Sequence, residues 1–149
     1  MPFWDASAVV PLCHRQPATS VLRRLLTEHP RPVVWWDTAV EVRSALARLL
    51  REGALTAHGQ QQALQRLSLL RRSWAEVLPT EALRSLAEDL PDIYGLRAAD
   101  SLQLAAALIW CRERPRGRAF ICFDDRLAEA AAAAGFDVIG TRRKPVSAR

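Results

Sequence analysis

The chain has 149 residues, of which half are hydrophobic and a quarter are charged. This length suits one domain with a core of its own, and the composition excludes long disorder, collagen-like repeats and coiled coil. The 21 Lys and Arg against 16 Asp and Glu leave a formal charge of +5, which is compatible with an anionic partner such as nucleic acid but does not require one.

The first half of the chain alternates between extended and helical patterns. A short apolar start at residues 2–10, in which Asp5 ends the first strand, precedes a helical stretch that ends near residue 29. Two prolines then stop the helix and open PVVWW, residues 32–36, whose β-branched and aromatic residues predict a buried strand. From Val40 to Gly53 the apolar residues fall at helical spacing, and a second apolar stripe at residues 63–70 predicts another helix.

The second half repeats the alternation. Residues 73–79 form a short strand candidate, and Thr80 is expected to cap the helix that follows. Residues 102–110 are apolar almost all round, which indicates a helix buried on most sides. AFICF, residues 119–123, predicts a strand, a helix follows up to a Gly135 cap, and residues 136–140 predict the last strand.

Strands separated by helices predict an α/β fold with a parallel sheet of about five strands flanked by helices. We expect one domain over residues 1–140 and a basic tail at residues 141–149. No apolar run is long enough to span a membrane, and the N-terminus does not resemble a signal peptide, so a cytoplasmic protein is expected. Three cysteines without C-x-x-C spacing predict free, buried thiols: Cys13, Cys111 and Cys122.

Four acidic residues follow predicted strands or open predicted helices. Asp5 ends the first strand, and Glu41 lies one short turn beyond PVVWW. Asp100 starts the buried helix, and Asp124 follows AFICF directly, with Asp125 beside it. In open α/β sheets, ligands collect at the carboxyl ends of the strands, so this edge is the candidate site.

Taken singly, each of these acids is explained as a helix cap. Taken together, they require more, because carboxylates gathered at one edge of a sheet repel each other unless a cation holds them. Glu41 and Asp100 also lie against apolar helix faces, where an unpaired carboxylate is costly. Oxygen ligands without His or Cys favour Mg²⁺, with Mn²⁺ as a substitute, over zinc.

The order of DASAVV, EVRSALARL, LRAADSLQLAAAL and FICFDDRLAEAAAAAGFDVIG resembles the PIN-domain family, and within it the VapC-type toxin ribonucleases of bacterial toxin–antitoxin pairs. The resemblance extends over residues 3–140. It implies a PIN-like fold, an acidic pocket that binds Mg²⁺ or Mn²⁺, and endonucleolytic cleavage of RNA that leaves a 5′-phosphate and a 3′-hydroxyl. It also implies a homodimer that is held in check by a small antitoxin protein.

The resemblance assigns catalytic and metal-binding roles to four acidic positions of this sequence: Asp5, Glu41, Asp100 and Asp124. Ser7 matches a small hydroxyl residue that often lies near the metal in the family.

Three positions complicate the match. Cys122 stands where relatives often have Thr or Ser, which removes a good hydrogen-bonding hydroxyl near the metal. Asp37 is an extra carboxylate four residues before Glu41. Asp124 fits the fourth position better than Asp125, which we expect to point elsewhere.

Binding of RNA requires basic or aromatic side chains, since an acidic pocket alone repels phosphates. The candidates are Arg15, Arg43 and Arg97 beside the acidic motifs, and Arg112, Arg114, Arg116 and Arg118 in the loop before the fourth strand. Trp35 and Trp36 adjoin the site and are able to stack on a base, although core packing is favoured for tryptophans in a strand. Trp4, Trp74 and Trp110 are expected in the core.

Two other classes of protein share part of this pattern. A phosphorylated receiver domain has an acidic pair after its first strand and a lysine, whereas the pair Asp124 and Asp125 comes late in this chain. The only lysine here is Lys144 in the tail, so this class is excluded. A non-catalytic PIN-like module for RNA binding or protein interaction remains the alternative, and the intact acidic set argues against it. The apolar residues at 20–26 and the stripe Ala63, Leu64, Leu67 and Leu70 predict the surface of a two-fold dimer.

Overall fold

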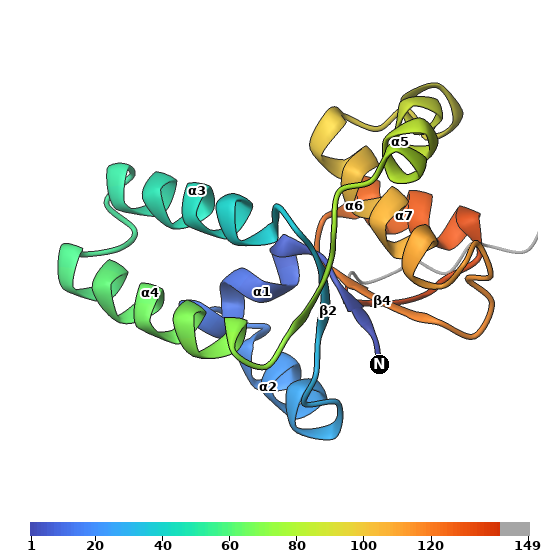
Figure 1. Ribbon diagram of the computed structural model, residues 1–149. Helices are drawn as coiled ribbons and strands as arrows, with labels where there is room; N and C mark the ends of the chain where they lie inside the picture. The colour runs from blue at the N-terminus through green and yellow to red at the C-terminus, as the bar shows by residue number, and fades with distance from the viewer. Residues whose placement is uncertain (141–149) are drawn as a thin grey trace, which may run out of the picture.

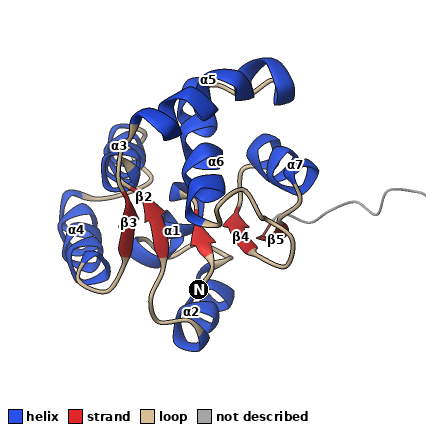
Figure 2. Ribbon diagram, turned by 45° about the vertical axis from the view of Figure 1, so that its right-hand side comes forward, coloured by secondary structure: helices blue, strands red, loops and turns tan. Residues whose placement is uncertain are grey.

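The computed structural model describes residues 1–140, which fold into one parallel sheet with helices on both faces (Figures 1 and 2). The five strands lie in the order β3-β2-β1-β4-β5. This confirms the predicted PIN-like α/β architecture. The strands are β1 (Phe3–Trp4), β2 (Val33–Trp35), β3 (Ala75–Val77), β4 (Ala119–Cys122) and β5 (Asp137–Gly140).

The helices divide into two groups by the face of the sheet that they cover (Figure 1). One face is covered by α1 (Ala6–Cys13), α2 (Thr19–Glu28), α3 (Thr38–Arg51) and α4 (Ala57–Arg71). The other is covered by α5 (Glu81–Tyr94), α6 (Ala98–Trp110) and α7 (Asp125–Ala134). Right-handed crossovers produce this division, because the chain moves toward one edge of the sheet through β3 and then toward the other through β5.

The core follows from the two-residue period of the strands. Phe3 stacks on Phe120 of the neighbouring strand, with ring centroids 5.3 Å apart, on the face of α5, α6 and α7. Trp4 and its register partner Ile121 are equally buried on the opposite face, among α1 to α4. Both faces of the central strands are therefore dry, as is usual for a parallel sheet.

The strand order reverses between β1 and β4, which are neighbours in the sheet although more than a hundred residues separate them in sequence. At such a point the two connecting segments leave in opposite directions and open a crevice beyond the carboxyl ends of the strands. Asp5 follows β1 and Asp124 follows β4, so both border this crevice.

Several local predictions are confirmed. Thr80 caps α5 by accepting a hydrogen bond from the Leu83 N–H at 3.2 Å. Gly135 ends α7 in the left-handed conformation, with φ of 115°. The three cysteines are free and buried.

Other predictions need correction. The chain after β1 forms two helices, α1 and α2, where one helical stretch was expected. Trp36 lies beyond the end of β2 and is 53% exposed, whereas Trp35 packs in the core. Trp74 and Trp110 are only partly buried. Within residues 1–140 every helix is too short or too polar to span a bilayer, and the predicted basic tail lies outside the described residues.

Candidate active site

Asp5 directly follows the central strand β1 and caps helix α1. Its backbone N–H donates to the Ile121 carbonyl at 3.0 Å, which extends the pairing of β1 with β4. Its Oδ2 accepts hydrogen bonds from the backbone N–H of Ser7 at 3.1 Å and from the Ser7 hydroxyl. The side chain is 4% exposed, so its carboxylate is held in one orientation at the floor of the crevice.

Ser7 and Cys122 connect Asp5 to the end of β4. The Ser7 hydroxyl oxygen accepts a hydrogen bond from the Phe123 N–H at 2.9 Å. The Cys122 sulfur lies 3.7 Å from Asp5 Oδ2 and 3.4 Å from the Asp124 nitrogen, which donates to it. The thiol thus occupies the place where the family often has a hydroxyl, and it fills that place as a weaker hydrogen-bonding group.

Asp124 and Asp100 approach the site from the other group of helices. Asp124 caps α7, with Oδ1 accepting from the Leu127 N–H at 2.9 Å. Asp100 lies in the first turn of α6. An open pocket of about 340 Å³ lies between these helix starts, and five charged residues line it: Arg97, Asp100, Asp124, Asp125 and Arg126. Asp125, which we expected to point elsewhere, therefore belongs to the pocket wall.

Glu41, in the first turn of α3, completes the acidic set from across the sheet. Its Oε2 accepts a hydrogen bond from Gln103 Nε2 at 3.1 Å, whereas its Oε1 is buried without a hydrogen-bond partner. Gln103 is the residue that the sequence analysis missed. Its signal was a single amide in the middle of an otherwise apolar helix, since an amide buried there needs a polar partner.

Burial, aided by repulsion from neighbouring acids, raises the pKa values of Asp5, Glu41 and Asp100. Burial raises the pKa of Asp5 above its usual range, and the charge of Asp124 adds to the effect. Burial, Asp124 and Asp5 likewise raise the pKa of Asp100, against the lowering effect of Arg126 and Arg97. Burial is also the main reason that the pKa of Glu41 rises to about 7, with Asp5, Asp37 and Asp100 as repelling neighbours.

These side chains suit a divalent cation by their chemistry. A cation relieves the mutual repulsion, and the buried, unpartnered Oε1 of Glu41 is an oxygen available to it. Within residues 1–140, no three Asp, Glu, His or Cys side chains already surround a single point, so an ion would gather them by side-chain rotation. Asp124 is exposed and Asp100 is half-buried at their helix starts, which leaves room for such rotation. The oxygen-only set favours Mg²⁺ or Mn²⁺.

The arginine-rich loop before β4 does not reach this site. Because it precedes a parallel strand, it lies at the amino edge of the sheet, opposite the acids. There Arg118 places its guanidinium over the Trp110 ring, 5.4 Å from the centroid. Four of the RNA-binding candidates therefore lie away from the acidic pocket: Arg112, Arg114, Arg116 and Arg118. Arg97 does line the acidic pocket, together with Arg126, which the sequence analysis did not single out.

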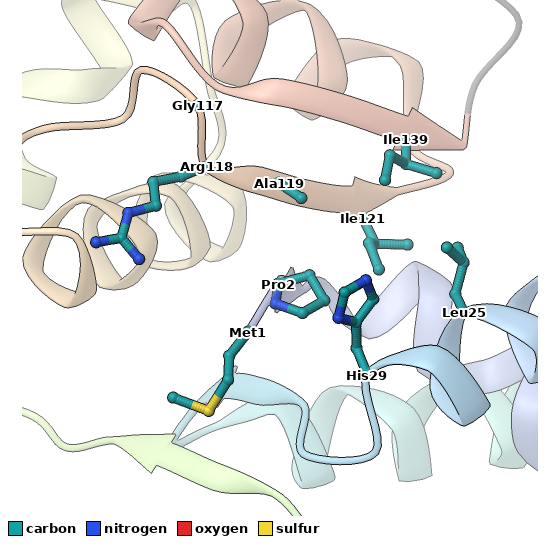
Figure 3. Close-up of a pocket in the computed structure, with 9 residues that line it drawn as sticks. All are labelled: Met1, Pro2, Leu25, His29, Gly117, Arg118, Ala119, Ile121 and Ile139. Carbon is teal, nitrogen blue, oxygen red and sulfur yellow. The ribbon is translucent and has the colours of Figure 1, made fainter.

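A second cavity, of about 220 Å³, opens at that amino edge (Figure 3). Pro2, Ile121 and Ile139 contribute apolar walls, and the His29 ring lies over them. Arg118 extends away from these walls in the same view. Among residues 1–140, no carboxylate lines the cavity, so those residues do not make it a metal site.

Replacement of Glu41 by Gln is expected to flatten the pH dependence of stability in metal-free protein. The folded state holds the Glu41 proton more tightly than the unfolded chain does, since its pKa rises from 4.5 to about 7. The free energy of unfolding of the wild type should therefore fall as pH rises through that window, by on the order of 3 kcal/mol from this group. Urea unfolding in EDTA at pH 5 and pH 8 measures it.

Glu52→Gln provides the control, because Glu52 is 60% exposed and pairs only loosely with Arg48 at 4.0 Å. That variant should keep the pH dependence of the wild type. An equal pH dependence in wild type and Glu41→Gln would show that Glu41 is not the group that titrates.

Comparison with known proteins agrees with this geometry. The family model described as "PIN domain" matches residues 3–133. The chain is also 34% identical over 145 residues to "Ribonuclease VapC46" of Mycobacterium tuberculosis (strain ATCC 25618 / H37Rv), which covers 92% of this chain and 95% of the relative. The family-model match includes the segments that carry Asp5, Glu41, Asp100 and Asp124. The chain therefore belongs to the PIN domain family.

Proposed function

We propose that this protein is a metal-dependent endoribonuclease that acts in the cytoplasm as the toxin of a toxin–antitoxin pair. The observation that carries the proposal is that four carboxylates, each in the cap or first turn of a different helix, lie close enough for their charges to act on one another beside the point where the strand order reverses. The name of the M. tuberculosis relative, a ribonuclease, supports RNA as the substrate. We further propose that residues 1–140 form the nuclease domain and that residues 141–149 are a basic tail outside it.

Each of the four acidic residues has its own role at the proposed ion site. A divalent ion, Mg²⁺ or Mn²⁺, supplies positive charge against the phosphate oxygens when bound, and it makes water a stronger acid. Asp5, fixed by Ser7, and Asp100 are the residues that would hold it most directly. Glu41 would hold the ion from the start of α3 through Oε1, which is buried without a hydrogen-bond partner. Asp124 would hold the ion directly or through water.

Substrate contacts come from the rim of the pocket. Arg97 and Arg126 face the acidic pocket and provide positive charge for backbone phosphates of RNA. Trp36 follows β2, and its 53% exposed ring rests edge-on against Trp35, with centroids 6.4 Å apart. A ring held in this way can stack on an unpaired base, which favours single-stranded RNA.

The direct test is cleavage of a labelled single-stranded RNA by purified protein. Cleavage is expected with Mg²⁺ or Mn²⁺ and not in excess EDTA, and the products should carry a 5′-phosphate and a 3′-hydroxyl. A protein that binds the RNA with equal affinity in every buffer and never cuts it would support the non-catalytic PIN-like module instead.

The toxin role implies an antitoxin partner. An Arg or Lys side chain of such a partner would pair with the carboxylates, exclude the cation and occupy the path of the phosphate. A short neighbouring gene for a DNA-binding protein would support this role, and co-purification of its product with the chain would test it.

The protein is expected to be a homodimer. Only part of the predicted apolar dimer surface is available to a second chain, because Ala63 and Leu67 are buried in the chain's own core. What remains is a groove of about 340 Å³ between α2 and α4, to which Leu26 and Leu69 contribute, with Leu69 62% exposed. Light scattering should give about twice the 16.6 kDa chain mass, and Leu69→Glu should shift it toward the monomer.

Ser68→Glu, one residue away on the exposed side of α4, is the matched control and should stay dimeric. A wild-type protein that is monomeric across micromolar concentrations would contradict the dimer. A dimer unaffected by Leu69→Glu would place the interface elsewhere.

A further inference from the structure

Gln103 is a polar side chain in a place where the fold has no need of one. It is 0% exposed and lies in α6 among Leu104 and alanines that are equally buried. Its amide nitrogen donates two hydrogen bonds across the gap between α6 and α3, to Thr38 Oγ1 at 3.2 Å and to Glu41 Oε2 at 3.1 Å. Both of these partners come from the start of α3.

The bond to Glu41 has a directional consequence. It engages Oε2 and leaves Oε1 buried and without a partner. A glutamate side chain has three rotatable torsions, and a hydrogen bond to one oxygen removes most of that freedom. Thr38 is itself fully buried, so it holds the Gln103 amide in place, and that amide in turn holds Glu41.

A purely structural role does not explain this arrangement. The Oε1 atom of Gln103 is buried without a hydrogen-bond partner, so the residue carries an uncompensated polar atom that a leucine or methionine would avoid. Gln103 lies three residues after Asp100 on α6, so the two side chains occupy neighbouring positions on one helix face. The helix that carries one acid thus also carries the group that orients another.

We propose that Gln103 is a positioning residue that holds Glu41 with Oε1 turned to the cation, so that the α3 and α6 sides of the site are set by one hydrogen-bonded clamp, Thr38–Gln103–Glu41. The inference rests on the proposed metal-dependent function. It deepens that function by assigning metal affinity to a residue outside the acidic set. Partners that orient metal ligands commonly change metal affinity by about 10- to 100-fold when they are removed.

The test is Gln103→Met, which keeps nearly the same length and volume and removes both hydrogen bonds. Mn²⁺ binding, measured by calorimetry on the full chain, should weaken by about tenfold or more. The Mn²⁺ concentration for half-maximal RNA cleavage should rise in parallel, whereas the rate at saturating Mn²⁺ should change much less. Gln61→Met, at an exposed position of α4, is the matched control and should bind Mn²⁺ as the wild type does.

A second measurement asks whether the effect passes through Glu41. In a Glu41→Gln background, titrated to high Mn²⁺ concentration, Gln103→Met should have little further effect, because its target is gone. An equal loss of affinity in both backgrounds would overturn the proposal. So would an unchanged Mn²⁺ affinity in a folded Gln103→Met protein, or the absence of Mn²⁺ binding by the wild type.

Thr38→Val serves if Gln103→Met does not fold, because it removes only the second anchor of the clamp and should weaken Mn²⁺ binding to a smaller degree. An unchanged affinity in Thr38→Val would then count against the clamp. The two levels of inference fail separately. Wild-type protein that binds Mn²⁺ and does not cleave RNA would refute the proposed nuclease function, while the Gln103 variants would still decide the clamp by their Mn²⁺ affinity.

Discussion

Asp5→Asn and Asp100→Asn are each expected to lower the rate of RNA cleavage by on the order of a hundred- to a thousandfold, while the protein stays folded. The loss follows from removing a negative oxygen that holds the cation. The fold survives because asparagine is as good an N-cap as aspartate, so the bond from the Ser7 N–H can persist. In EDTA both variants should unfold at the same urea concentration as the wild type or a higher one, since one repelling charge is gone.

Asp89→Asn is the matched control, because Asp89 is an exposed acid on α5 away from the pocket. Its cleavage rate should equal that of the wild type. Undiminished cleavage by both Asp5→Asn and Asp100→Asn would mean that the acidic crevice is not the catalytic site.

Phe3→Ala is expected to cause the largest loss of stability, about 3–5 kcal/mol, which is a substantial part of what a domain of this size has. Phe3 is fully buried in a central strand of only two residues, and its ring lies against Phe120 and Trp110, at 5.3 and 6.4 Å between centroids. Removal of the ring leaves a cavity beneath the strand that positions Asp5. Urea unfolding followed by circular dichroism at pH 7 measures the loss.

Val21→Ala, at a side chain that is 52% exposed on α2, removes apolar atoms without opening a cavity and should change stability by less than about 0.5 kcal/mol. A Phe3→Ala protein as stable as Val21→Ala would indicate that the core relaxes to fill the space. In that case β1 would not depend on its aromatic neighbours.

Much of the fold could be predicted from the sequence, because the signals that mark strands and helix ends are local. Thr80 and Gly135 mark helix ends by side-chain chemistry that acts over three or four residues, and AFICF has too few residues for a buried helix. The four acids could be predicted as candidates for the same reason, since each stands next to a recognisable strand or helix start. Parallel pairing then brings those starts to one edge without further information from the sequence.

The features that could not be predicted from the sequence depend on contacts between residues that are distant in the chain. Gln103 acquires its meaning from Glu41, 62 residues away, and only packing brings α6 against α3. Trp36 differs from Trp35 because β2 ends between them, and strand ends are poorly marked in an aromatic run. The position of Arg118 over the Trp110 ring depends likewise on packing between distant segments, here the loop before β4 and the end of α6.

Each of the four acids stands at the N-terminal end of a helix: α1, α3, α6 and α7. Those helices aim the positive ends of their peptide dipoles at the crevice, about half an elementary charge from each. The carboxylates thus lie over a fixed positive background that side-chain substitution does not remove. An amide variant keeps that background and loses a repelling charge, so the phosphates of RNA meet a more attractive surface in the inactive protein than in the metal-free active one. A variant of these acids can therefore lose RNA cleavage while it keeps RNA binding.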